Sequence, residues 1–208
     1  MTHISTKEFQ ESLSPAEALQ MLKDGNERYL NRKEAVKEFY KQVEATTNGQ
    51  WPYAAILGCI DSRVPSEIVF DQGVGDLFNA RVAGNFANTD ILGSLEYACA
   101  VAGSKLIVVL GHTSCGAVKS ACDGVELGNI THLLSNITPV VDSVETVEGE
   151  ARNATNESFV QNVADKNVLD TVAAIKAKSS ILNELCESGK INIVGAMYDV
   201  KTGKVSWL

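Results

Sequence analysis

The chain has 208 residues, of which 45% are apolar, and this length and composition suit one domain with a single hydrophobic core. Its 26 acidic residues outnumber its 18 basic residues, and the net charge of -8 argues against binding to nucleic acid or to an anionic membrane surface. No stretch approaches the roughly 20 apolar residues of a transmembrane helix. The N-terminal residues have neither the basic start nor the apolar core of a secretory signal. We therefore expect one soluble domain that spans residues 1–208.

The cysteines indicate a reducing compartment. There are five, an odd number at irregular spacing, unlike the dense and even framework of a small secreted domain. They are Cys59, Cys99, Cys115, Cys122 and Cys186. We expect a cytoplasmic protein, in which reduced thiols remain available to bind a soft metal ion as thiolates.

The segment before the first apolar run is expected to form an N-terminal helical arm over residues 1–48. A helix is predicted to begin after Ser14, which is a suitable N-cap, with Pro15 at the first helical position and Glu17 placed to complete a capping box. Gly25 lies inside this helix and weakens its intrinsic stability by about 1 kcal/mol relative to alanine.

Four short apolar runs then alternate with helical patterns. The runs are residues 54–61, 76–84, 105–112 and 191–199. The first, third and fourth are almost continuously apolar, which is typical of parallel strands that are covered on both faces. A turn at residues 201–203 predicts a terminal hairpin. The sequence thus predicts an α/β fold in which a central, mostly parallel β-sheet is flanked by helices, with an N-terminal helical arm and a C-terminal hairpin.

Apolar residues at helical spacing separate these runs and predict helices between the strands. The set between the second and third runs is Ile91, Leu95, Ala98 and Ala102. A longer and less regular set before the fourth run is Phe159, Val163, Val172, Ile175, Leu182 and Leu185. Gly189 follows as the expected C-cap, so the helical pattern is predicted to end there.

Polar side chains suited to chemistry follow the first and third apolar runs. Cys59, Asp61 and Arg63 lie at the end of the first run, and His112 and Cys115 at the end of the third. The carboxyl ends of parallel strands meet at one edge of an open α/β sheet, where ligands bind. We therefore expect these five residues to converge at that edge.

Thiolate and imidazole groups are ligands that zinc prefers, and a catalytic zinc keeps one tetrahedral position open for water or substrate. Cys59, His112 and Cys115 supply three such ligands, and the sequence offers no fourth at a suitable spacing. Cys122 lies two helical turns beyond Cys115, and His132 has no second ligand nearby. Each residue alone is a weak signal, since a lone cysteine on a strand is most often a core residue. Together they predict a three-ligand zinc site of the catalytic type.

The chain resembles the β-carbonic anhydrases in a motif of two parts, Cys59-x-Asp61-x-Arg63 and Gly111-His112-x-x-Cys115-Gly116. The likeness extends from the N-terminal helix to the ending YDVKTGKV. This resemblance implies reversible hydration of carbon dioxide to bicarbonate and a proton, with one Zn²⁺ per chain. The implied zinc ligands are Cys59, His112 and Cys115. The implied catalytic dyad is Asp61 with Arg63.

Five further positions match residues that bind substrate or line the pocket in that family. They are Gln50, Phe78, Ala83, Tyr97 and Gly116. Gln50 matches the position that hydrogen-bonds substrate or product, while Ala83 is smaller than the valine often found at its position. The resemblance also implies a homodimer or homotetramer whose pocket is completed across a subunit interface.

Some members of the family also have a regulatory bicarbonate site and a closed form in which the aspartate itself binds zinc. Arg81 matches one part of that regulatory site, but Ile56 stands where a tryptophan is expected. We therefore expect an ordinary open enzyme without strong inhibition by bicarbonate.

Two alternatives share the same zinc ligands. The first is a hydrolase of carbonyl sulfide or carbon disulfide, because the pocket walls rather than the ligands would select the substrate. The second is a non-catalytic zinc-binding regulatory protein, although such a protein has no need of Asp61, Arg63 and Gln50. A nucleotide-binding module is disfavoured, because the glycines at positions 73 and 75 precede a predicted strand instead of opening a helix.

Overall fold

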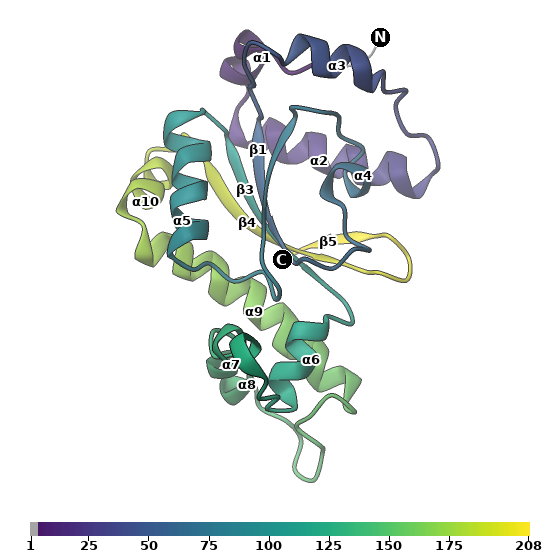
Figure 1. The fold of residues 1–208 in the computed structure, drawn as a ribbon, viewed down its shortest axis with the longest axis vertical. Helices are drawn as coiled ribbons and strands as arrows, with labels where there is room; N and C mark the ends of the chain where they lie inside the picture. The colour runs from purple at the N-terminus through teal and green to yellow at the C-terminus, as the bar shows by residue number, and fades with distance from the viewer. Residues whose placement is uncertain (1–3) are drawn as a thin grey trace.

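The computed structural model describes residues 4–208, which contain a five-stranded β-sheet (Figure 1). The strands are β1 Ala54–Gly58, β2 Leu77–Arg81, β3 Leu106–His112, β4 Asn192–Tyr198 and β5 Val205–Trp207. Their order in the sheet is β2-β1-β3-β4-β5, with β1 to β4 parallel and β5 antiparallel to β4. This arrangement confirms the predicted α/β fold with a mostly parallel sheet and a C-terminal hairpin.

Helices flank the sheet on both faces (Figure 1). They are α1 Lys7–Ser12, α2 Pro15–Leu30, α3 Phe39–Ala45, α4 Ser66–Val69, α5 Thr89–Glu96 with a π-helical continuation Tyr97–Val101, α6 Gly116–Cys122, α7 Gly128–Leu134, α8 Thr138–Ser143, α9 Glu157–Lys178 and α10 Ser180–Glu187. Among the residues that the structure describes, no helix combines the length and the apolar content needed to cross a bilayer.

The strands divide their side chains between two hydrophobic cores. In β1, Ala55 and Leu57 belong to the core that includes residues of α5, α9 and α10, whereas Ala54 and Ile56 belong to the core that includes residues of α2. The side chains of β3 alternate between the same two cores. Because both faces of the sheet are buried, these strands are apolar at every position instead of at every second one.

The start of α2 follows the prediction. The Ser14 hydroxyl accepts a hydrogen bond from the N–H of Glu17, and the Glu17 carboxylate accepts one from the N–H of Ser14 at 2.8 Å, which completes the capping box. Gly25 weakens the helix by propensity but is required by packing, because a Cβ at this position would overlap the carbonyl oxygen of Phe70. The glycine lets α2 approach the end of α4 closely.

The helical pattern over residues 159–185 forms two helices, α9 and α10, where the sequence predicts one continuous pattern. The chain turns at Ser179, whose hydroxyl donates to the Glu96 carboxylate at 2.6 Å and accepts from the N–H of Leu182 at 3.2 Å. This hydroxyl therefore caps α10 and ties it to α5. Gly189 lies just beyond α10 with a positive φ of 69°, as expected of the residue that ends a helix.

Asn26 links α2 to two distant segments, and its replacement tests how much this link stabilises the fold. Its Nδ2 donates to the carbonyl oxygens of Val69 and Gly203 at 3.0 Å, and its Oδ1 accepts from the N–H of Val205 at 2.9 Å. Asn26→Ala is expected to lower the free energy of unfolding by on the order of 3 kcal/mol, because each buried backbone group left without a partner costs about 1–3 kcal/mol. Chemical denaturation measures the change. Asn183→Ala is the control, because the Asn183 side chain donates a solvent-exposed hydrogen bond to Glu187 within α10, and equal destabilisation by both variants would contradict the prediction.

Candidate metal centre and active site

The candidate ligands lie at the point where the order of the strands reverses, because successive strands are added on opposite sides of β1. From β1 the chain passes to β2 on one side and then to β3 on the other side of β1. Ligands in open α/β sheets bind beyond the carboxyl ends of the strands at such a point. Cys59 directly follows β1, His112 is the last residue of β3, and Cys115 is the N-cap of α6.

The side chains of Cys59, His112 and Cys115 converge at this edge and could hold a metal ion. Their ligand atoms all lie within 4.8 Å of one another, and all three residues are buried. The two sulfur atoms are 3.9 Å apart. Two sulfurs bound to one tetrahedral zinc at about 2.3 Å are expected to lie about 3.8 Å apart, so the spacing fits that ion.

The imidazole of His112 is oriented so that one of its nitrogens faces the two thiols without a partner. Its Nδ1 lies 3.0 Å from the carbonyl oxygen of Thr113, so the hydrogen-bond network assigns the ring proton to Nδ1. Its Nε2 is buried and has no hydrogen-bond partner in the described structure. A buried polar atom without a partner costs free energy, and a metal ion at this position would remove that cost.

The two thiols titrate as a pair because their sulfur atoms are in contact. The hydrogen bond from Cys115 lowers the pKa of Cys59 below its usual range, with smaller contributions from His112 and from the N–H of Gly84. The contact with Cys59 and burial raise the pKa of Cys115 well above its usual range. The contact between the sulfurs therefore favours the thiolate form of Cys59, which is the form that binds a metal.

Asp61 and Arg63 form a paired carboxylate and guanidinium beside the cluster. Arg63 donates from Nε to Oδ1 of Asp61 at 2.9 Å and from its second guanidinium nitrogen to Oδ2 at 2.7 Å, while its backbone N–H also donates to Oδ1 at 2.9 Å. These bonds hold the pKa of the Asp61 carboxyl well below its usual range. Oδ2 of Asp61 lies 3.9 Å from Nε2 of His112. The dyad thus places an ionised carboxylate next to the candidate ligands.

Arg81 supports this loop in a way that the sequence does not predict. Its Nε donates to the carbonyl oxygen of Cys59 at 2.7 Å, and a terminal guanidinium nitrogen donates to that of Asp61 at 2.6 Å. These contacts depend on the β1–β2 register, which pairs Gly58 with Arg81 and which no local pattern reveals. The resemblance directs attention to Arg81 only as part of a regulatory site. Ile56, the other residue considered there, is fully buried in β1.

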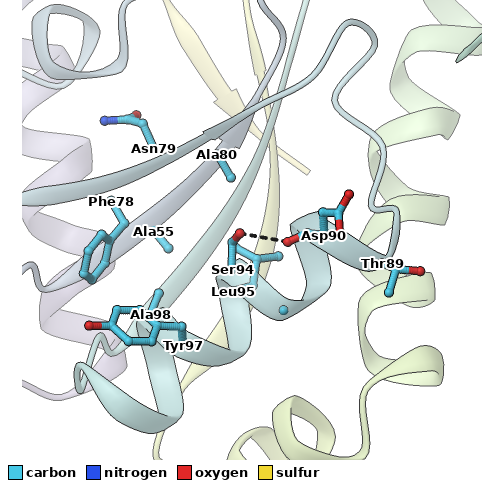
Figure 2. Close-up of a pocket in the computed structure, with 11 residues that line it drawn as sticks. Ala55, Phe78, Asn79, Ala80, Thr89, Asp90, Ser94, Leu95, Tyr97 and Ala98 are labelled. Atoms are coloured by element: carbon cyan, nitrogen blue, oxygen red, sulfur yellow. Dashed lines mark hydrogen bonds between the residues drawn. The ribbon is translucent and has the colours of Figure 1, made fainter.

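Phe78 and Tyr97 come together, but away from the metal ligands of the same chain. Their rings meet edge to face with centroids 6.3 Å apart, and both line a cavity of about 590 Å³ (Figure 2). Phe78 pairs with Ala55, four residues before Cys59, so it lies about 13 Å back along the strand at about 3.3 Å per residue.

Gln50 is also distant from the metal ligands, whereas two of the expected pocket residues lie beside them. Gln50 is exposed and precedes the amino end of β1, while Cys59 follows the carboxyl end. Ala83 immediately precedes Gly84, whose N–H donates to the sulfur of Cys59 at 3.4 Å. Gly116 immediately follows Cys115 and begins α6. One chain therefore brings Ala83 and Gly116 to the cluster, but not Gln50, Phe78 or Tyr97.

Comparison with known proteins agrees with this geometry. The family model described as carbonic anhydrase matches residues 54–205. Carbonic anhydrase 2 of Mycobacterium tuberculosis strain H37Rv is 38% identical over 194 residues, which cover 92% of this chain and 91% of that protein. The chain belongs to the carbonic anhydrase family. A carbonic anhydrase of Mycolicibacterium smegmatis is 36% identical, over 92% of each chain.

Solved structures identify the class of carbonic anhydrase. The β-carbonic anhydrase of Coccomyxa, solved in complex with acetazolamide, superposes with a TM-score of 0.72 at 25% identity over 91% of this chain and 86% of that chain. A β-carbonic anhydrase of Aspergillus fumigatus gives a TM-score of 0.68 at 25% identity over 93% and 89%. The chain is thus an enzyme of the β-class carbonic anhydrases, as the two-part motif predicts.

The geometry of the cluster predicts that metal binding requires Cys59 and Cys115 but not the three cysteines outside the cluster. We expect metal-free protein to bind one Co²⁺ per chain, with the strong near-ultraviolet absorption of cobalt–thiolate bonds. Cys59→Ser is expected to weaken binding by at least about 100-fold, because it removes one of three ligands. Cys122→Ser is the matched control, since Cys122 is also buried but lies outside the cluster. Undiminished Co²⁺ binding by Cys59→Ser would contradict the assignment.

Proposed function

We propose that this carbonic anhydrase is zinc-dependent and interconverts carbon dioxide and bicarbonate, with one Zn²⁺ per chain held by Cys59, His112 and Cys115. The observation that carries the proposal is the unpartnered Nε2 of His112, which is buried against two thiols and faces an ionised carboxylate 3.9 Å away. A structural zinc site would be closed by a fourth ligand. Among the described residues the cluster has three members, and the group beside it is already paired with Arg63.

A zinc ion in a three-ligand site supplies a hydroxide nucleophile at neutral pH by lowering the pKa of water. The residues of the chain would then direct that nucleophile. Asp61, being ionised, can accept a hydrogen bond but cannot donate one, so it would hold the hydroxide proton and leave an oxygen lone pair facing the carbon of the substrate. Arg63 binds both carboxylate oxygens and thereby fixes the direction of the acceptor.

The same acceptor would select the species that reach the site. A small anion with no proton would meet the negative carboxylate of Asp61 without a hydrogen bond to offset the repulsion. Hydroxide and bicarbonate each carry a proton that Asp61 could accept. In this proposal the dyad gives the reaction both its direction of attack and its preference for protonated oxygen species.

We infer that substrate binding is completed by a second copy of the chain, in a homodimer or homotetramer. Ala83 and Gly116 line the site from the chain that holds the metal, and the remaining pocket residues, Gln50, Phe78 and Tyr97, are supplied by its neighbour. The support is the separation of about 13 Å between Phe78 and the ligands of its own chain. Phe78 and Tyr97 instead line an open cavity of about 590 Å³, and Tyr97 is exposed.

The cellular setting is proposed from the cysteines and the charge. All five cysteines are free in the structure, which suits the reducing cytoplasm. The net charge of -8 disfavours nucleic acid and anionic membranes as partners, and the partners proposed are carbon dioxide, bicarbonate and other copies of the chain. Without the expected tryptophan at position 56, we propose no strong inhibition by bicarbonate.

Asp61→Asn tests the proposed chemistry. This variant keeps the shape of the side chain but can turn a donor toward the nucleophile, so we expect carbon dioxide hydration to fall by about 10²–10⁴-fold with zinc still bound. Stopped-flow measurement of the initial rate, on protein of known zinc content, gives the result. Asp24→Asn, on the exposed surface of α2, is the control and should keep full activity.

The wild-type rate in the same experiment separates the alternatives. Rapid hydration of carbon dioxide supports the proposal. Full zinc occupancy with no hydration but with turnover of carbonyl sulfide or carbon disulfide would replace it by the hydrolase, and no turnover of any of the three would favour a regulatory zinc protein. A fully active Asp61→Asn would refute the role of the carboxylate.

The exposed apolar side chains of α3 provide a test of the oligomer. Phe39, Tyr40 and Val43 are more than half exposed, which is costly for a helix face that stays in water. The double variant F39D/Y40D is expected to shift the protein toward monomers and to reduce carbon dioxide hydration in parallel, as analytical ultracentrifugation and stopped flow would show. Val147→Asp, in an exposed loop, is the control. A wild-type monomer with full activity would overturn the inference.

A further inference from the structure

Asn167 is a buried polar residue in the middle of α9, and the chemistry described above does not use it. Only 2% of its surface is exposed, and its neighbours on the same helix, Val163, Ala164 and Val168, are all buried in the apolar core. Its Nδ2 donates to the carbonyl oxygen of Gly84 at 2.8 Å. A buried polar group in an apolar core costs free energy unless it is hydrogen-bonded, and the carbonyl of Gly84 satisfies this one.

That partner, Gly84, is in direct contact with a candidate metal ligand. Its N–H donates to the sulfur of Cys59 at 3.4 Å. Gly84 has a φ of 82°, in the left-handed region, and Asn85 follows with a φ of 44°. A Cβ on Gly84 would also clash with the Cδ1 of Ile137. Glycine and asparagine adopt the left-handed region more readily than other residues, and the space beside Gly84 admits no side chain, so the sequence of this loop suits the backbone path that Asn167 contacts.

We propose that Asn167 is a positioning residue for the metal site, which acts through Gly84 on Cys59. Gly84 is bonded on both sides: its carbonyl accepts from Asn167, and its N–H donates to the sulfur. Loss of the first bond frees the loop to rotate and weakens the second. A thiolate that loses an N–H donor is less well stabilised as an anion at its ligating position, so metal binding weakens. This inference rests on the proposed function only in taking the cluster to be the metal site.

A purely structural role for Asn167 predicts something different. In that case its loss would leave the Gly84 carbonyl unsatisfied and destabilise the fold, but would not change metal affinity beyond the effect of any comparable core substitution. Thr171 offers a matched comparison, because it lies one turn further along α9, is also buried and lines the same small cavity of about 110 Å³. The two residues thus share the helix, the depth and the cavity.

The experiment compares Asn167→Leu and Asn167→Ala with Thr171→Val. Leucine keeps the approximate size of the asparagine without its donor, and the alanine variant serves if leucine prevents folding. Metal-free proteins are first compared by thermal unfolding. Affinities for Zn²⁺ and Co²⁺ are then measured by competition with a chelator, and the cobalt–thiolate absorption is recorded. We expect both Asn167 variants to bind metal about 10-fold or more weakly, with an altered cobalt–thiolate band, while Thr171→Val matches the wild type.

Metal affinity decides the role of Asn167, whereas the rate of carbon dioxide hydration decides the proposed reaction, so the two can fail separately. Equal metal affinities and identical cobalt spectra in all variants, whatever their thermal stabilities, would overturn the role of Asn167. Weakened binding in Thr171→Val to the same extent would do so as well, since the effect would then belong to the helix and not to the hydrogen bond. A wild-type protein that binds zinc but does not hydrate carbon dioxide would refute the proposed reaction and leave this inference to be decided by the affinities.

Discussion

The parallel pairing of β1 with β3 is the constraint on which the candidate site depends. In this register Gly58 lies opposite Leu110, so that Cys59, the next residue, is level with Gly111 and adjacent to His112. A shift of the register by one residue would turn the β1 side chains to the opposite face of the sheet and separate the two ligands. Close packing opposes such a shift, because the shift would exchange Ala55 and Leu57 on one face with Ile56 on the other, and each core is filled by side chains of particular size. Core packing therefore sets the metal-site geometry.

Around the ligands lies a set of contacts that come from distant segments. Arg81 holds the carbonyls of the β1 loop, and Asn167 holds Gly84 against Cys59. The C-terminal hairpin contributes as well: the Thr113 hydroxyl accepts from the N–H of Val200 at 3.0 Å, and the Thr113 N–H donates to the carbonyl of Tyr198 at 2.9 Å. Thr113 in turn presents the carbonyl oxygen that orients His112. The hairpin, at the far end of the chain, thus holds Thr113, and the carbonyl of Thr113 fixes which nitrogen of His112 carries the proton.

Features that depend on neighbouring residues could be predicted from the sequence, and features that depend on long-range contacts could not. The capping box of α2 joins two residues that are three positions apart, and the continuous apolar runs report burial directly, so both were predictable. The approach of Cys59 to His112 followed from the general rule for open α/β sheets. By contrast, the partners of Arg81 and Asn167 lie about 20 and 83 residues away in the sequence, and no periodicity encodes them. The requirement for glycine at position 25 was equally hidden, because it arises from contact with the carbonyl of Phe70, which is distant in the sequence.

The charges of the site are balanced locally, although the chain as a whole is acidic. Two thiolates offset the charge of a divalent ion, and Arg63 offsets Asp61 through a bidentate contact, so the proposed site has little net charge while the chain carries -8. A neutral molecule such as carbon dioxide gains nothing from electrostatic steering, and an acidic surface does not repel it. Bicarbonate is an anion, and a near-neutral site would hold it without strong electrostatic attraction. The local charge balance therefore suits the proposed interconversion, in which a neutral and an anionic species must both enter and leave the same site.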